Sequence, residues 1–396
     1  MLFKRKEFLQ IGSLATASTM FPKFLSALDK PLVPPGNKVT VVIQFSGGND
    51  GLNTVVPISN DIYYRERPMI AIKKEEALKL TDDAGLNPEL TALRDLYHDG
   101  SLSIINNVGY PNPDHSHFRS MDIWHSASNS DEYLSSGWIG RYLDAQCKRC
   151  DKPTQALEID DMLSLALKGE HEKGLAFKDP RRLYSSSKEK YYKDLNHGHH
   201  DHDELVDYLY KTMGSTLNSA DYIYEKSRAR PTSATYPSTE LGQGLKTISS
   251  LIMSDINTKV YYISLGSFDT HVNQNQQQKR LFADFNESVK AFTTDLKKNN
   301  RFNDVLIMTF SEFGRRVSQN ASNGTDHGTA NNMFLIGGGL KQQGVVNDMA
   351  NLSDLNDGDL KYKVDFKSVY ATVLDKWLDA DADKILGKKF DRMNFI

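Results

Sequence analysis

Three apolar segments, each followed at once by polar residues, constrain the fold of this 396-residue chain most strongly. Residues 39–45, 260–265 and 304–310 are nearly continuous apolar runs, the pattern of strands covered on both faces of a sheet. Segments with helical spacing alternate with them, which predicts an α/β fold with a largely parallel mixed sheet sandwiched between helices. In such sheets ligands bind beyond the carboxyl ends of the strands, so the three polar clusters are expected to form one site.

Residues 38–396 are expected to form a single domain. Within it the composition shifts toward Lys, Tyr, Ser, His and Asp from about residue 168 to 235, which indicates a helical insertion packed on the sheet. The histidine-rich run at 197–202 could hold a transition metal or could be a solvated loop. The remaining expected elements are helices at 88–98, 116–126, 137–146, 240–255, 274–298 and 366–378, and strands at 101–108, 155–159 and 333–336.

Charge and cysteine content exclude some classes of function. With 48 basic and 51 acidic residues, the net charge of -3 gives no basic field of the kind that binds nucleic acid. The two cysteines, Cys147 and Cys150, cannot supply the four ligands of a structural zinc site. They could form a local disulfide, a redox pair or two idle thiols, and the lack of a thioredoxin-like context favours idle or structural thiols.

The first 30 residues have the order of an export signal and linker. A basic stretch containing Arg5 and Lys6 precedes an apolar segment at 11–21 and small residues at 25–27. The apolar segment is too short and polar for a stable membrane span. The segment is similar to a twin-arginine signal, although the basic pair is Arg-Lys; an amphipathic helix is the alternative. We therefore expect export, to the periplasm or beyond, with the export machinery as a partner.

A candidate metal site is formed by Asp269, His271 and His327. In an extended segment Asp269 and His271 share a face, and with His327 they make a two-histidine, one-carboxylate set suited to zinc or another divalent ion. Alternatively, Asp269 caps the following helix and His271 is a surface residue.

Glu312 and the residues around it offer a second group of candidates. Glu312 follows a strand and could reach a metal, or could form an ion pair with Arg315 or Arg316. The segment at 323–329, which contains His327, has glycines that permit close approach to a ligand, but it could also be a plain turn.

The segment at 113–120 supplies candidates for anion binding and nucleophilic attack. A helix start there would favour anions, and Arg119 could bind a phosphate or sulfate. Ser116 is the candidate nucleophile, although capping of the helix would also explain a serine at this position. A G-x-S-x-G nucleophile elbow, a P-loop and a G-x-G-x-x-G motif are all missing from the sequence. Their absence weakens the alternatives of an α/β-hydrolase and of a nucleotide-binding protein.

Together these motifs resemble a known family. From about residue 39 to the C-terminus the chain closely resembles the secreted bacterial family called domain of unknown function 1501, whose activity is not established. The segments that carry the resemblance are 44–53, 116–124, 137–141, 268–271, 310–315 and 325–329.

That family is similar to the alkaline phosphatase and sulfatase superfamily, which implies a mixed sheet between helices with two metals at the strand ends. The resemblance places Asp269, His271 and His327 in one metal site and Glu312 at the position of a metal-binding Asp. It puts Ser116 near the nucleophile. Ser46 and Phe313 stand where two further ligands are expected, with Asn49 and Asp50 as possible substitutes for the first.

Two hypotheses follow. The first is an exported metal-dependent hydrolase of a phosphate or sulfate ester, from a small molecule or glycan. In it Ser116 attacks or orients a water, and Arg119 and Arg315 neutralise the ester oxygens. The second is an exported binding or assembly protein that has kept the fold without the chemistry. Convergence of Asp269, Glu312, His271 and His327 within reach of one ion would favour the first.

Overall fold

The computed structural model describes residues 37–146, 154–189 and 204–396, and Lys38–Ile396 form one compact unit. The predicted export signal, the two cysteines and the histidine-rich run lie outside the described residues. In the part of the chain that the structure describes, every helix is too short or too polar to cross a membrane.

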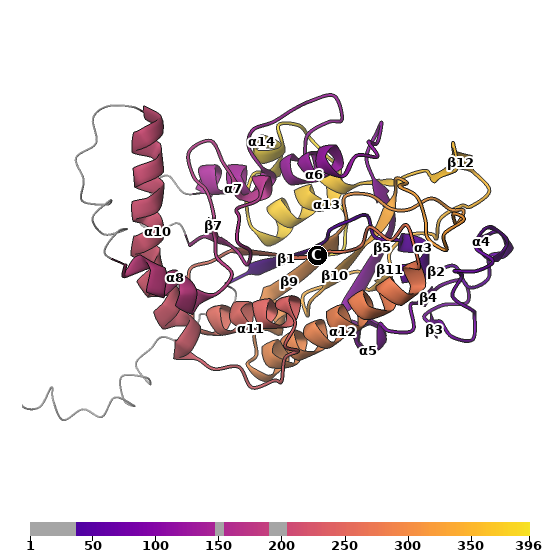
Figure 1. Ribbon diagram of the computed structural model, residues 1–396, viewed down its shortest axis with the longest axis horizontal. Coiled ribbons are helices and arrows are strands. Elements are labelled where there is room, and N and C mark those ends of the chain that lie inside the picture. The colour runs from indigo at the N-terminus through magenta and orange to yellow at the C-terminus, as the bar shows by residue number, and fades with distance from the viewer. Residues whose placement is uncertain (1–36, 147–153, 190–203) are drawn as a thin grey trace, which may run out of the picture. The chain divides into compact units, whose positions relative to one another are not determined.

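A nine-stranded mixed sheet runs through this unit, in the order β11-β5-β10-β9-β1-β8-β6-β7 with β14 paired to β5 (Figure 1). At its centre β1 (Val39–Phe45) pairs in parallel with both β8 (Val260–Leu265) and β9 (Val305–Phe310). β10 (Asn331–Ile336) is antiparallel to β9 and to β5 (Leu102–Gly109). The prediction of a largely parallel mixed sheet is confirmed. The shorter strands of this sheet are β6 (Ala156–Glu158), β7 (Leu175–Ala176), β11 (Gly344–Val345) and β14 (Val364–Asp365).

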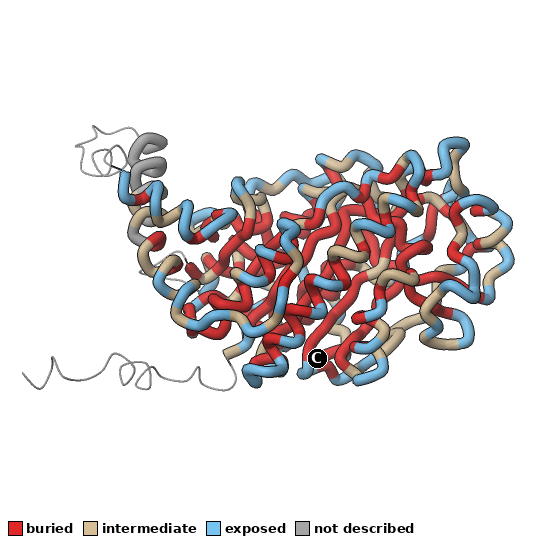
Figure 2. The backbone as a smooth tube through the Cα atoms, turned by 60° about the horizontal axis from the view of Figure 1, so that its bottom comes forward, coloured by how far each residue is buried: buried red, intermediate tan, exposed pale blue. Residues whose placement is uncertain are grey.

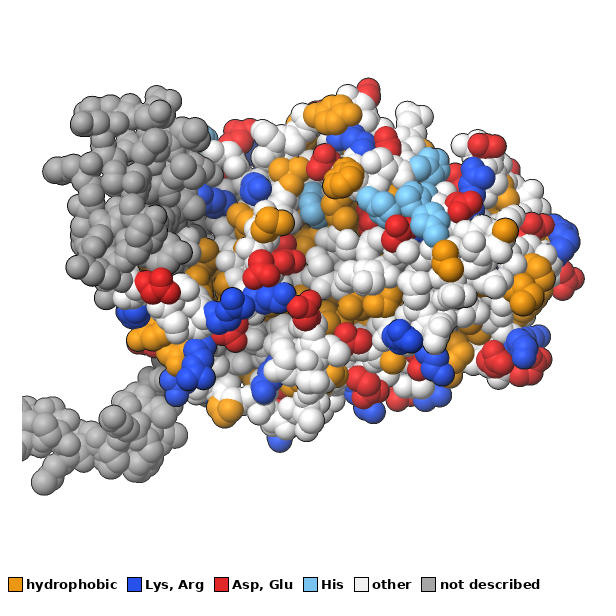
Figure 3. Space-filling model, in the orientation of Figure 1, with side chains coloured by type: hydrophobic (Ala, Val, Ile, Leu, Met, Phe, Trp, Pro, Cys, Tyr) orange, Lys and Arg blue, Asp and Glu red, His pale blue; other side chains and the backbone are white. Residues whose placement is uncertain are grey.

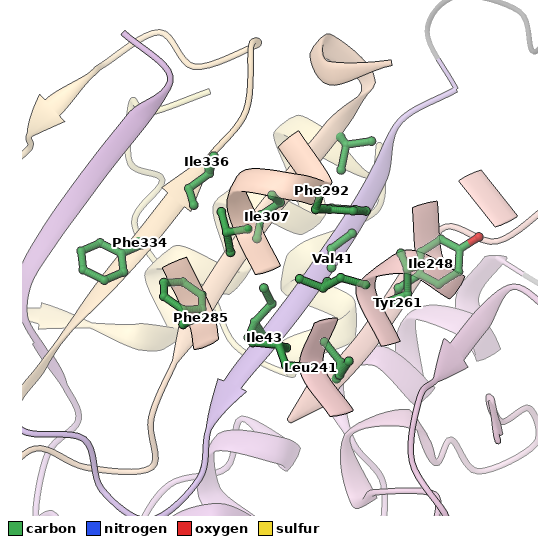
Figure 4. Packing of buried hydrophobic residues seen from close by; sticks show 14 of the residues in the cluster. Val41, Ile43, Leu241, Ile248, Tyr261, Phe285, Phe292, Ile307, Phe334 and Ile336 are labelled. Atoms are coloured by element: carbon green, nitrogen blue, oxygen red, sulfur yellow. The ribbon is translucent and has the colours of Figure 1, made fainter. Parts of the chain in front are cut away.

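Helices cover both faces of the sheet because the strands bury side chains on both. Along β1, the residues Val39, Val41 and Ile43 belong to one core, whereas Val42 belongs to the other. The first core is closed by α5 (Thr91–His98), α11 (Glu240–Met253) and α12 (Gln274–Lys298), and Figure 4 shows side chains of α11 and α12 against the strands. The second is closed by α6 (His117–Ser126), α7 (Trp138–Gln146), α13 (Phe366–Thr372) and α14 (Ala382–Leu386). Figure 2 shows how completely the strands are buried.

The predicted elements are found within a few residues of their expected ends, and the last helix continues from α13 into a π-helical turn, η3 (Val373–Trp377). The segment at about 168–235 contributes β7 to the edge of the main sheet, followed by α8 (Pro180–Ser187) and α10 (Glu204–Ala229). The remaining short elements are α3 (Gly51–Thr54), β2 (Val55–Val56), α4 (Asp61–Glu66), β3 (Leu78–Lys79), β4 (Gly85–Leu86), η1 (Leu165–Leu167), η2 (Phe302–Asp304), β12 (Leu355–Asn356) and β13 (Asp359–Leu360).

Glu158, the last residue of β6, is buried, and this burial predicts a pH-dependent stability. Burial raises the pKa of Glu158 from 4.5 to about 7, although the Ser164 amide donates to its carboxylate at 2.7 Å. Between these values the unfolded chain ionises before the folded one, so stability falls as pH rises. The full difference corresponds to about 3 kcal/mol above pH 7.

Glu158→Gln, which keeps an acceptor for the Ser164 amide, is therefore expected to be more stable than the parent at pH 8, by up to about 3 kcal/mol. At pH 5 most of the difference is expected to disappear, leaving about 1 kcal/mol or less between the urea unfolding free energies of the two proteins. An equal difference at both pH values would contradict this assignment.

Candidate metal centre

The carboxyl ends of two of the three central strands, β8 and β9, and the start of α6 bring four side chains together. Asp269 and His271 follow β8, His327 lies in the loop between β9 and β10, and His117 is the first residue of α6. Asp269 Oδ1 lies 3.0 Å from His271 Nε2 and 3.3 Å from His327 Nε2, and Asp269 Oδ2 lies 3.5 Å from His117 Nε2. Figure 3 shows histidines gathered on this face with carboxylates beside them. The predicted convergence of Asp269, His271 and His327 is thus present.

His117 is the member of this cluster that the sequence interpretation missed. Its Nδ1 donates to Glu312 Oε1 at 2.9 Å, and this hydrogen bond raises the pKa of His117. Its Nε2 is buried and has no hydrogen-bond partner among the described residues. The sequence did offer a reason to consider His117 as a ligand, because it directly follows the candidate nucleophile Ser116.

Glu312 therefore has a different place from the one predicted. It is fully buried, accepts from the Gly47 amide at 2.7 Å and faces His117, not the open side of the cluster. It forms no ion pair with Arg315 or Arg316 in the structure as described; its role is to orient the imidazole. Behind it, the buried ring of Phe313 packs against both His117 and His327, at centroid distances of 4.9 and 4.7 Å.

His327 is oriented by the backbone of the segment before α6. Its Nδ1 donates to the His115 carbonyl at 2.8 Å, which leaves Nε2 facing Asp269. The His115 side chain is held in turn, because its Nε2 lies 2.8 Å from the buried Asp359 carboxylate. Burial lowers the pKa of His327, with a further contribution from the positive charge of Arg315. A neutral imidazole with a free Nε2 lone pair is the form that binds metals.

Arg315 joins the strand-end loops beneath the cluster. It is fully buried, and it donates to the carbonyls of Gly47 at 2.6 Å, Gly48 at 2.6 Å and Thr325 at 2.9 Å and to Asp269 Oδ1 at 2.6 Å. With its donors occupied in this way, Arg315 does not face a substrate, which corrects the expectation that it neutralises ester oxygens. It is a positioning residue for Asp269.

Asp269 is ionised under ordinary conditions. Burial on its own would raise the pKa of Asp269, but the hydrogen bond and charge of Arg315, together with His271 and His327, hold it below its usual value. The loop after β1 has to come very close to Asp269 to allow this arrangement. A Cβ on Gly47, whose φ is +119°, would lie 2.4 Å from the Asp269 amide nitrogen, so only glycine fits there.

The donor set fits a divalent metal ion. One ligand atom each from His117, Asp269 and His327 lies within 4.8 Å of the others, and this is the one such group of three among the residues that the structure describes. Two imidazoles and a carboxylate are ligands of catalytic zinc sites. Within the described part of the chain, His117 Nε2 has no hydrogen-bond partner, and the Nδ1 atoms of His117 and His327 are fixed by hydrogen bonds. A bound ion would require both features.

Two other candidate residues lie in structural networks instead. Asp50 is fully buried, caps α3 through the Leu52 amide, and forms an ion pair with Arg67, whose Nη2 lies 3.0 Å from Asp50 Oδ1. Gln274 also donates to Asp50. The expectation that Asp50 binds a metal is therefore corrected, because its oxygens are already engaged.

Arg119 is likewise not available to an anion. It is buried, and its Nη2 donates to the carbonyls of Asn129 and Ser130, both at 3.0 Å, and of Glu132. The guanidinium therefore holds the loop after α6, which corrects its predicted contact with an ester. Ser116, by contrast, is exposed at the N-cap of α6, and its hydroxyl caps no amide.

The carboxylates of Glu312 and Asp359 orient histidines without being proposed metal ligands, and this difference can be tested. Glu312→Gln is expected to weaken zinc binding by about 10- to 100-fold, the usual effect of removing a partner behind a metal-bound histidine, and Asp359→Asn is expected to weaken it less. Glu312→Gln should have the larger effect because Glu312 touches His117 directly, whereas Asp359 acts through His115. Calorimetric zinc titration of the metal-free protein measures both, and unchanged affinity in both variants would contradict these roles.

Fold and cluster together define an α/β protein with a histidine and carboxylate centre at the carboxyl ends of its central strands. The model of the family described as "Protein of unknown function (DUF1501)" matches residues 107–392, so the chain belongs to this family. A search of curated proteins gave no match.

Several solved structures resemble the chain at low identity. The PsFucS1 sulfatase from Pseudoalteromonas sp. is 11% identical, with a TM-score of 0.41 over 94% of this chain and 72% of that chain. A protein in the alkaline phosphatase superfamily from Vibrio parahaemolyticus is 12% identical, with a TM-score of 0.37 over 90% and 71%. The lipoteichoic acid synthase LtaP from Listeria monocytogenes is 9% identical, with a TM-score of 0.37 over 92% and 76%. These TM-scores are too low to assign an activity or a residue's role.

Proposed function

We propose that this protein is an exported metal-dependent hydrolase that acts on a phosphate or sulfate ester. The observation that supports this most is His117: its Nδ1 is held by a buried carboxylate, while its buried Nε2, which has no hydrogen-bond partner among the described residues, lies 3.5 Å from Asp269 Oδ2. An imidazole arranged in this way is prepared to bind an ion. Zinc or another divalent ion there would activate a nucleophile and stabilise the leaving oxygen.

The other roles in this reaction, binding the ion, attacking the ester and binding the anion, are assigned to particular residues. His117, Asp269 and His327 would hold the ion, and His271, with its Nε2 at 3.0 Å from both Asp269 Oδ1 and His327 Nε2, completes the set. The Ser116 hydroxyl, exposed one residue before His117, is the proposed nucleophile. Its oxygen would bond to the phosphorus or sulfur atom as the bond to the leaving alcohol breaks, and water would then release the anion. The amino-terminal turn of α6 would favour that anion.

The test uses the purified full chain with p-nitrophenyl phosphate and p-nitrophenyl sulfate. We expect turnover of at least one ester, its loss on complete chelation and its return on adding zinc. Ser116→Ala should abolish turnover while keeping the metal, whereas His327→Ala should lose both. Undiminished turnover after complete metal removal would contradict the mechanism.

One observation favours the alternative of an exported binding or assembly protein. Phe313, where the resemblance implies a ligand, fills its place with a buried ring packed against His117 and His327. Such a protein would bind metal and show no ester turnover in the same assay. Turnover that depends on His327 would exclude it.

A further inference from the structure

Two side chains of the candidate centre are each followed by an exposed apolar residue. Phe118, next to His117 in the first turn of α6, is 88% exposed, and Val272, next to His271, is 50% exposed. Figure 3 shows hydrophobic side chains beside the histidines on the same face. Leaving a phenylalanine ring in water forgoes about 1.5–3 kcal/mol of burial. Contact with an apolar group of a ligand at the edge of this centre would recover that burial.

A second exposed ring near the start of α6 is held in a fixed orientation. Tyr133 is 77% exposed, and the Arg119 guanidinium lies over its ring, 3.9 Å from the centroid. Arg119 is itself buried and fixed by the carbonyls of Asn129, Ser130 and Glu132, in the loop that leads to Tyr133. The guanidinium covers one face of the ring and leaves the other open. The loop thus presents a flat aromatic surface to solvent.

The polar residues around these two rings restrict what they can bind. Ser116 lies two residues before Phe118, and Asn129 and Asp131 lie four and two residues before Tyr133; all three are exposed. Exposed polar residues so near each ring in the chain favour two separate rings over the continuous apolar patch that a protein partner or an acyl chain would need. Separate flat rings among hydrogen-bonding groups suit a ligand with both a C–H face and hydroxyl groups. A sugar ring has both.

We propose that Phe118 and Tyr133 bind the sugar ring of a glycan whose sulfate or phosphate ester reaches the centre at His117. This substrate class rests on the proposed function, because the ester has to lie at that centre. The sugar would stack on the open face of Tyr133 and contact Phe118, with its hydroxyls toward the polar residues between them. Phe118 and Tyr133 would then determine specificity without taking part in the reaction.

Affinity electrophoresis of the full chain tests this with two pairs of polymers. Dextran sulfate and dextran phosphate carry sugar rings, whereas poly(vinyl sulfate) and polyphosphate carry the same anions without them. We expect at least one dextran ester to retard the protein more strongly than its ring-free counterpart. Phe118→Ala and Tyr133→Ala should each weaken that binding about three- to tenfold, as expected for loss of one ring contact.

Met162→Ala is the matched control, because Met162 is 80% exposed on the loop after β6 and its removal should change nothing. Equal retardation by each dextran ester and its ring-free counterpart, or retardation by neither dextran ester, would overturn the proposal. So would unchanged binding in both ring variants. Retardation measures binding and requires no ester hydrolysis, so the two proposals can fail separately. If only the hydrolase proposal fails, the protein will bind the dextran esters preferentially but will not hydrolyse p-nitrophenyl esters.

Discussion

Asp269→Asn is expected to lose stoichiometric metal binding and with it all measurable ester turnover. Asp269 is the residue on which His117, His271, His327 and Arg315 converge. The asparagine has nearly the same shape but no charge, so it cannot balance the charge of an ion or of Arg315. Removing a direct ligand should cost more than the roughly 100-fold upper effect of removing a partner behind one. Calorimetric zinc titration and p-nitrophenyl ester assays measure the two losses.

Asp357→Asn is the control for Asp269→Asn. Asp357 is also a surface carboxylate near an arginine, with its oxygen 3.8 Å from Arg316, but it does not contact the cluster. This variant should bind metal and turn over ester like the parent. Full metal binding by Asp269→Asn would show that the Asp269 carboxylate is not a ligand and would contradict its assigned role.

The second large effect concerns stability. Asp50→Ala is expected to destabilise the protein by about 3–5 kcal/mol, because it leaves the Arg67 guanidinium buried without its charge partner. Arg67 would keep its hydrogen bonds to Asn53 and to the carbonyls of Arg316 and Val317, but these are neutral acceptors. Urea unfolding at constant pH measures the loss.

The double variant Asp50→Ala, Arg67→Met is expected to recover part of this stability, since it removes the unpaired charge as well. Metal content per folded molecule should stay at the parent level in the single variant. A stable Asp50→Ala protein that has lost its metal would restore Asp50 as a ligand and contradict the structural role described above.

The sheet could be predicted from the sequence because burial on both faces leaves a direct signature. The runs that form β1, β8 and β9 are apolar almost throughout, and the alternation with helices implies parallel pairing. The convergence of Asp269 with His327 followed from the same rule, since both lie beyond carboxyl ends of central strands. Residue type and position relative to the sheet were enough for these features.

The partners of individual side chains could not be predicted in this way. Arg119 and Arg315 look alike in sequence as candidates to bind an anion, yet both are buried and donate to backbone carbonyls, Arg119 in the loop after its own helix and Arg315 in the loop after β1. Glu312 and His117 are 195 positions apart, and only the folded chain shows that one orients the other. Such choices depend on tertiary geometry that neither spacing nor periodicity encodes.

The central claim is that His117, Asp269 and His327 bind a divalent metal ion. Elemental analysis of the purified, untagged protein, alongside His117→Ala with its fold checked by circular dichroism, tests it most directly. We expect stoichiometric zinc or another divalent metal in the parent and its loss from the folded variant. A folded parent protein that contains no metal and binds none in a zinc titration would contradict the claim.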